Sequence, residues 1–254
     1  MFRWVRGLAA ALAAILATGS ASASADHVAG DAAPRHGTFE TSFRILRDGA
    51  PVGEHRYRFS LADGILTVSS NANATVTMLG LPVYRFTQSV HEVWREGRLV
   101  SLEATTDDNG VRTNVSATAT ARGLVVEGPR GRTVAAASAV PTTYWNTGTV
   151  RGAPLIDTRD GEVMPRRITP LAWERVAAAG GSAVAAQHYR IDGHKSCHIW
   201  YDGYGVWQRA ACQTEHGWIE DVPDRASGDR VQLARMLSGL YADGEHLAQR
   251  QPER

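Results

Sequence analysis

The sequence predicts a mainly all-β fold: a curved antiparallel meander that forms a barrel or half-barrel, with one C-terminal amphipathic helix. The first observation is the strict alternation of apolar and polar residues in many short stretches, clearest over residues 67–78. The second is the series of Asp-Gly, Glu-Gly and Asn-Gly pairs between these stretches, which are typical of tight hairpins. The third is the helical spacing of apolar residues near the C-terminus. Consecutive hairpins make a meander that closes or curls more simply than it divides into a sandwich.

The N-terminal end, residues 1–25, has the pattern of a secretory signal peptide. Two arginines precede an apolar run over residues 7–17, and small residues at Ala23 and Ala25 precede a cleavage site at Asp26. The apolar run is too short to span a bilayer, and no second apolar span follows it. We therefore expect an exported, periplasmic protein with no transmembrane segment after signal cleavage. The alternative is that the run is retained as an anchor.

The main domain is expected over residues 38–222, after a small, polar, flexible leader at residues 26–37. The expected strands cover residues 39–45, 56–59, 67–78, 83–94, 99–106, 111–119, 124–127, 133–136, 163–171, 173–177 and 183–191, followed by one on each side of Asp202-Gly203. Asn109-Gly110 is the clearest of the hairpin turns. The segment "VPTTYWNTGTVRGAPL", residues 140–155, breaks the alternation and predicts a long loop bounded by prolines.

The last segment, residues 223–254, predicts one helix and a polar tail. Ser227 or Asp229 can cap the start of this helix, and Gly244 can end it. The apolar residues at helical spacing are Val231, Leu233, Ala234, Met236, Leu237, Leu240 and Tyr241. The helix is expected to pack on the sheet or over its mouth, either as a plain cover of one face or as a functional lid.

Composition and charge exclude several classes of function. Hydrophobic residues make up 43% of the chain and charged residues 21%, as in ordinary globular domains. The formal charge of +1 falls to about −1 without the signal peptide, and the arginines are scattered, so no nucleic acid is expected as a partner. The chain has no nucleophile elbow, phosphate loop or dinucleotide fingerprint. We therefore expect no catalytic residues and no cofactor.

The stretch "GHKSCHIWYDGYGVWQRAACQTEHGW", residues 193–218, contains the only two cysteines, Cys197 and Cys212. Two strands around a turn near Asp202 would place these cysteines opposite each other or within two residues, and export favours a disulfide over two free thiols. A metal site is disfavoured because His194 and His198 lie about 13 Å apart if they share a strand. A cysteine nucleophile is disfavoured because His198 points to the other face from Cys197. The sequence therefore predicts a disulfide and no metal.

Five short motifs in a fixed order carry a resemblance to a known family. They are "RDG.PVGEH.Y.F" at residues 47–59, "VYRF.....EVWR.GRLVSLEATT.DNG.RT" at 83–113, "PTTYWN" at 141–146, "PLIDT..G" at 154–161 and "YDG.G.W" at 201–207. In these five motifs, the chain resembles an uncharacterised bacterial exported family, the domain of unknown function DUF6134. The resemblance implies an exported β-rich domain with no established activity. The cysteines and the C-terminal helix are departures from the family pattern, and apolar residues at the two cysteine positions in the family imply that both cysteines point inward.

The predicted function is non-enzymatic binding of an apolar small molecule or lipid, because barrels and half-barrels of this size can enclose one such ligand. Tyr144 and Trp145, in the Pro-bounded loop, are the candidates for a wall or lid, with Phe86 and Trp94 on one strand face behind them. The alternative is that all four are ordinary core or loop-packing residues. Two further hypotheses are a structural or assembly protein that meets another envelope protein through its helix or an edge strand, and a hydrolase with an unrecognised site.

Overall fold

The structure is a computed structural model that describes residues 36–164, 166–193, 196–214 and 217–238. The chain divides into two compact units, residues 1–32 and 33–254, and every described residue belongs to the second unit. The predicted signal peptide and most of the predicted leader therefore lie outside the described residues.

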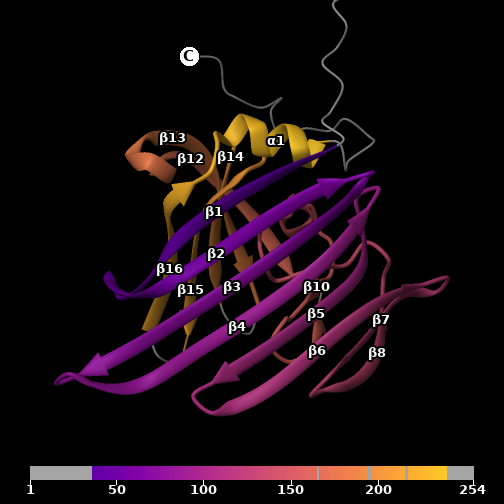
Figure 1. The fold of residues 1–254 in the computed structure, drawn as a ribbon, viewed down its shortest axis with the longest axis horizontal. Coiled ribbons are helices and arrows are strands. Elements are labelled where there is room, and N and C mark those ends of the chain that lie inside the picture. Colours follow the sequence, from indigo (N-terminus) through magenta and orange to yellow (C-terminus); the bar gives the residue numbers. More distant parts are fainter. Residues whose placement is uncertain (1–35, 165, 194–195, 215–216, 239–254) are drawn as a thin grey trace, which may run out of the picture. The chain divides into compact units, whose positions relative to one another are not determined.

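Within the described residues, thirteen strands form one antiparallel sheet in the order β12-β13-β14-β15-β16-β1-β2-β3-β4-β5-β6-β7-β8 (Figure 1). The strands are β1 (His36–Arg47), β2 (Ala50–Ala62), β3 (Ile65–Met78), β4 (Leu81–Arg95), β5 (Arg98–Asp108), β6 (Val111–Thr120), β7 (Gly123–Gly128), β8 (Gly131–Ala135), β12 (Arg167–Ala177), β13 (Ala183–Asp192), β14 (Cys197–Asp202), β15 (Trp207–Thr214) and β16 (Gly217–Ala226). The sheet is not closed, because β8 and β12 are its two edges. The predicted all-β fold with a half-barrel meander is confirmed.

The pairing of β1 with β16 joins two meanders into this single sheet. One meander runs from β1 to β8 and the other from β12 to β16, and the two meet where Phe43 lies opposite Pro223. The second meander differs from the prediction in two respects. The pattern did not predict β16, although this strand joins the two meanders through its pairing with β1. The expected strands are 163–171 and 173–177, whereas residues 163–164 belong to a separate small sheet and β12 runs from Arg167 to Ala177 through a bulge between Pro170 and Trp173. A bulge keeps the strand continuous while it bends.

Five hairpin turns of the first meander share one backbone conformation. Each has a non-glycine residue and then a glycine at positive φ, which is the geometry of a type I′ turn and matches the twist of the strands. In four of them the first residue is polar: Asp48, Asp63, Glu96 and Asn109. In the fifth, between β3 and β4, it is Leu79, with a φ of 52°. This one exception lies in a turn that the sequence pattern did not single out.

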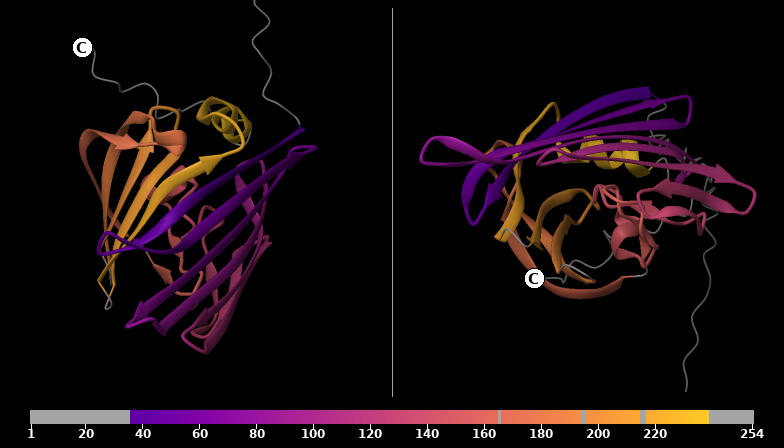
Figure 2. Two further views of the ribbon diagram at one scale, coloured as in Figure 1. Left: turned by 60° about the vertical axis from the view of Figure 1, so that its left-hand side comes forward. Right: turned by 90° about the horizontal axis from the view of Figure 1, so that it is seen from below.

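The concave face of the sheet is covered by the segment between β8 and β12, residues 136–166 (Figure 2). This segment contains a small sheet of β9 (Val140–Pro141), β10 (Leu155–Ile156) and β11 (Val163–Met164), and the short 3-10 helix η1 (Thr147–Val150). Its apolar side chains belong to the same buried cluster as those of the large sheet. We call the described residues of this segment, 136–164 and 166, the plug.

Helix α1 (Arg230–Ser238) follows the last strand and packs Leu233, Met236 and Leu237 into the main core. The Oδ1 of Asp229 accepts a hydrogen bond from the N–H of Gln232, so Asp229 is the cap, one of the two predicted choices. The remainder of the predicted helix, with Tyr241 and Gly244, lies outside the described residues. No helix in the described ranges is long and apolar enough to cross a membrane.

Candidate functional site

The centre of the concave face brings together two of the four predicted ligand-binding residues. Trp94 of β4 and Trp145 of the plug are 1% and 2% exposed, and their rings meet edge to face with centroids 5.2 Å apart. Trp145 also meets the ring of Phe59 edge to face at 5.6 Å. The two tryptophans therefore join the plug to the sheet.

A buried carboxylate, Glu92, lies between these tryptophans. Its Oε2 accepts a hydrogen bond of 2.7 Å from the Nε1 of Trp94 and one of 3.1 Å from the Nε1 of Trp145. Its Oε1 accepts a bond of 2.7 Å from the hydroxyl of Thr143. Burial is the largest influence and raises the pKa of Glu92 to about 7, while the three donors act in the opposite direction. Glu92 is a polar anchor for the plug.

Sequence reasoning missed Glu92, although a signal was present. The residue lies two positions after Val90 and two before Trp94, on the apolar face of the alternating pattern. A carboxylate on that face has to find partners, because burying it alone is costly. One partner, Trp94, is two residues away on the same strand, but Thr143 and Trp145 come from the plug, about fifty residues further along the chain, so local pattern reasoning could not name them.

Tyr144, the third predicted residue, lies beside the cysteine pair. Its hydroxyl is 3.7 Å from the Sγ of Cys197 and 3.9 Å from that of Cys212. The hydroxyl of Tyr201 donates to the backbone oxygen of Tyr144 at 2.5 Å, and this bond helps hold a φ of 61° that aromatic residues rarely adopt. Burial raises the pKa of Tyr144, and the charge of Asp157 acts in the same direction.

Phe86, the fourth predicted residue, is not part of this cluster. It is half-buried on β4, eight residues or about 26 Å along the strand from Trp94. The guanidinium of Arg159 lies 6.0 Å from the centroid of its ring. The structure therefore brings Trp94 and Trp145 into contact, places Tyr144 next to Trp145 in the plug, and leaves Phe86 apart.

Cys197 and Cys212 form a disulfide between β14 and β15, where they face each other directly. The register agrees with the folding of the chain around Asp202, whose Oδ1 accepts hydrogen bonds from the N–H groups of Tyr204 and Val206. The predicted pairing is confirmed. A disulfide is compatible with an exported protein.

Replacing both cysteines with alanine is expected to lower the free energy of unfolding by up to about 3 kcal/mol without unfolding the protein. The bond closes a loop with a sequence separation of 15, for which the loop-entropy model gives a cost of about this size. Thermal denaturation of the wild-type protein and of the double variant, both without reductant, measures the difference. Titratable thiols in the native, unreduced protein would contradict the premise.

A second polar group that the sequence did not reveal links β2, β3 and β16. The Nδ1 of His55 is 3.0 Å from a carboxylate oxygen of Asp221, and its Nε2 is 2.8 Å from the hydroxyl of Ser70. A serine, a histidine and an aspartate that contact one another in this way resemble the catalytic triad of a hydrolase. However, Ser70 is only 2% exposed and lies in the middle of a central strand. The backbone N–H groups around it are used by the sheet ladder, so they are not free to stabilise an oxyanion. The group serves to tie the strands together.

A third polar group lies on β13 and β14, on the face of these strands that points away from the main buried cluster. The Nε2 of His188 is 2.7 Å from the Nδ1 of His198, and its Nδ1 is 2.8 Å from the carboxylate of Glu174. Burial, and then the charge of His188, lower the pKa of His198. Trp200 stacks on His188 with centroids 4.2 Å apart. Within the described residues, no group of three or more His, Cys, Asp or Glu side chains could hold a metal ion, and His194 lies outside them.

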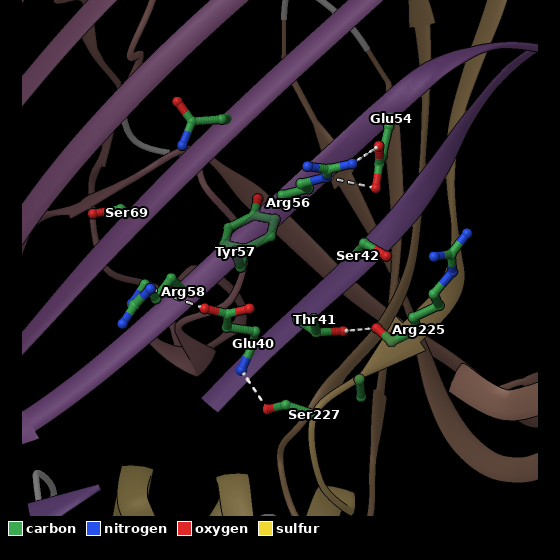
Figure 3. Close-up of a pocket in the computed structure, with 12 residues that line it drawn as sticks. Glu40, Thr41, Ser42, Glu54, Arg56, Tyr57, Arg58, Ser69, Arg225 and Ser227 are labelled. Atoms are coloured by element: carbon green, nitrogen blue, oxygen red, sulfur yellow. Dashed lines mark hydrogen bonds and ion pairs between the residues drawn. The ribbon is translucent and has the colours of Figure 1, made fainter. Parts of the chain in front are cut away.

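The structure also has a shallow polar groove where β1, β2 and β3 meet the end of β16 (Figure 3). Its main cations are already paired. Arg56 donates two bonds of 2.7 Å to Glu54, and Arg58 lies 3.1 Å from Glu40. The hydrogen bonds from Arg56 lower the pKa of Glu54. The charged side chains that line the groove are therefore largely paired with one another.

An apolar surface occurs instead at the tip of the β3–β4 hairpin. Met78, Leu79, Leu81 and Val83 are 63%, 98%, 69% and 47% exposed. Met78 ends the alternating stretch over residues 67–78, which is typical of a strand with one buried face, but its side chain is exposed, and β2 pairs with β3 only as far as Ala74.

Beyond that point no described strand pairs with either side of the hairpin, and the β5–β6 turn contributes one backbone hydrogen bond of 2.8 Å, from the N–H of Asn109 to the oxygen of Arg85. On its other flank, β5 pairs with β4 only from Phe86 inward. Residues 75–85 thus form a two-stranded projection whose end stands beyond the neighbouring turns in Figures 1 and 2. We call these residues the finger.

Comparison with known proteins identifies the family. The family model "Domain of unknown function (DUF6134)" matches residues 43–220, well over half of the chain. The chain belongs to this family. The resemblance predicted from the five sequence motifs is confirmed. The match includes the finger, Glu92 and the disulfide, and it ends before α1 of this DUF6134 chain.

The DUF6134 fold is similar to that of a solved structure, described as a beta-barrel-like protein of domain of unknown function DUF1849 from Brucella abortus. The two chains share 10% sequence identity with a TM-score of 0.53, over 74% of this chain and 96% of that chain. At this identity the likeness concerns the fold alone. The search of curated proteins found no match.

Proposed function

We propose that this DUF6134 chain is a non-enzymatic protein, exported to the periplasm, that binds an apolar or amphipathic partner through the tip of its finger. The observation that carries the proposal is Leu79, which is almost fully exposed at a turn position where four sibling turns have polar residues. The predicted signal peptide and the disulfide support the proposed location.

The tip is costly for the folded protein and contributes nothing to its core. A leucine at positive φ is less favourable than glycine by about 1 to 2 kcal/mol, and asparagine or aspartate is tolerated better there. Exposed leucine and methionine side chains gain no burial on folding. A two-stranded hairpin without neighbours is at best marginally stable in water. Binding of an apolar partner would offset these costs, because it would bury the side chains that the fold leaves exposed.

Carriage of a ligand inside the half-barrel is the second candidate function. In that case Tyr144, Trp145, Phe86 and Trp94 would line the site, and the positive φ of Tyr144 supports a specialised role for its loop. A ligand would have to displace Trp145, whose ring and N–H group are both engaged with the sheet. The finger needs no such displacement, and for this reason we favour it. A role in envelope assembly is compatible with the finger, since the partner could be another envelope component.

Replacing Leu79 and Leu81 together with asparagine is expected to reduce retention on octyl-agarose strongly, at fixed salt, without lowering the melting temperature. Asparagine suits the positive φ of position 79, and both side chains point to solvent, so the fold should not suffer. The matched control replaces Val100 and Val134, which are 36% and 54% exposed elsewhere on the sheet, with asparagine. Unchanged retention of the finger variant, or an equal loss in the control, would contradict the proposal.

A further inference from the structure

We infer that the partner of the finger is the surface of a phospholipid bilayer, an inference that rests on the proposed function and specifies it. The finger would insert its tip among the upper parts of the acyl chains while the half-barrel stays in water. Four features of the finger favour a bilayer over a pocket in another protein: the order of its residues, the charges at its base, the small size of its apolar surface, and its length.

The residues of the finger change in character from the tip toward the base. The tip is apolar from Met78 to Val83, and the next two residues of β4 are Tyr84 and Arg85. An apolar end followed by an aromatic residue with a polar group and then by a cation is the order found at membrane interfaces. Aromatic residues with polar tips favour the headgroup level, and cations favour the phosphates.

The charge at the base of the finger is complementary to anionic headgroups. Arg85 is exposed, and no acidic side chain of the described ranges pairs with it. The nearest acids are in the β5–β6 hairpin, where Asp107 pairs with Arg112 and Asp108 pairs with Arg159 at 3.0 Å each. The hydroxyl of Tyr84 also donates to Asp108. The local acids are thus neutralised by other groups, and the charge of Arg85 remains available.

The apolar surface is too small for a typical protein interface. A specific interface takes about 20 to 30 residues from each partner, whereas the apolar tip is one turn with four exposed apolar side chains. A bilayer requires no complementary surface, and binding to it grows with the apolar area inserted. Neither strand of the tip is covered by a neighbour, so apolar side chains around the tip would all contact lipid at once.

The length of the finger also suits this interface. Leu81 lies five residues beyond Phe86, the last residue of β4 that pairs with β5, which corresponds to about 16 Å of extended strand. Interfacial segments bury their apolar faces about 5 to 10 Å into the boundary between headgroups and acyl chains. The tip can therefore reach that depth before the rest of the sheet meets the headgroups. Val111, 66% exposed at the start of β6, next to the β5–β6 turn, would lie near the headgroup level.

Co-sedimentation with vesicles tests the inference. Exported protein, with its N-terminus established by sequencing, is mixed with vesicles of phosphatidylcholine alone or with phosphatidylglycerol added. We expect wild-type protein to bind, and the Leu79→Asn/Leu81→Asn variant to show a partition coefficient at least about tenfold lower. Arg85→Gln should reduce binding about fivefold, but only to the vesicles with phosphatidylglycerol. The Val100→Asn/Val134→Asn control should bind like wild type.

The possible outcomes separate this inference from the proposed function. If wild-type protein binds octyl-agarose through the tip but binds neither kind of vesicle, the bilayer is excluded and a protein pocket becomes the partner. If neither matrix nor vesicle distinguishes the finger variant from the control, both proposals fail. Because the variants and the wild type share the same N-terminal segment, any contribution of that segment cancels in the comparison.

Discussion

Replacing Trp145 with alanine is expected to lower the free energy of unfolding by about 3 to 5 kcal/mol, the usual cost of truncating a large buried aromatic residue. The side chain is 2% exposed, meets the rings of Trp94 and Phe59, and donates its N–H to Glu92. Its removal leaves a cavity and deprives a buried carboxylate of one of its donors. Urea denaturation of the wild-type and variant proteins measures the effect.

Trp218→Ala is the matched control, since that tryptophan is 37% exposed and lies at the start of β16, so its loss should cost far less. Binding of an apolar probe should be measured on the same Trp145 variant. A large loss of stability with probe affinity intact would remove the plug from the binding site. A small loss of stability with weakened probe binding would instead favour carriage inside the half-barrel and argue against the finger.

The second large effect concerns pH. Burial raises the pKa of Glu92 from 4.5 to about 7 in the folded protein. Below pH 4.5 the group is protonated in both the folded and unfolded states, so its contribution to stability is fully present there. Between pH 4.5 and 7 the unfolded chain releases the proton and the folded protein keeps it, so stability falls as pH rises through this window and levels off above it. The difference between a pKa of 4.5 and one of about 7 corresponds to roughly 3 kcal/mol.

The Glu92→Gln variant should lose this part of the pH dependence while remaining folded. The amide oxygen of glutamine can accept from Trp94 and Trp145, and its amide nitrogen can donate to the hydroxyl of Thr143, so the network is conserved. Denaturation curves between pH 4 and 8 provide the measurement, with Glu103→Gln as the same change at an exposed position of β5. An identical pH slope in wild type and the Glu92 variant would show that Glu92 does not titrate in this range.

Much of the candidate site was open to prediction from local patterns, and some of it was not. The pairing of Cys197 with Cys212 followed from one hairpin register, because both cysteines lie within the same pair of strands. Trp94 and Trp145 could be named as candidates, but their contact could not, since it depends on how the plug returns to β4. The exposure of Leu79 depends on where β2 and β5 stop pairing, and alternation within β3 and β4 carries no information on that.

The sequence by itself determined most strands of the large sheet but not β16, and it determined most of the turns, the capped start of the helix, the disulfide and the membership of the DUF6134 family. These features depend on residues close together in the chain, where side-chain alternation and turn chemistry act directly. Only the tertiary structure decided that the plug fills the concave face, that Glu92 is buried among its donors, and that the finger stands free. Each of these features depends on the presence or absence of contacts between segments far apart in the sequence. A local pattern of residues does not determine the energies of such contacts.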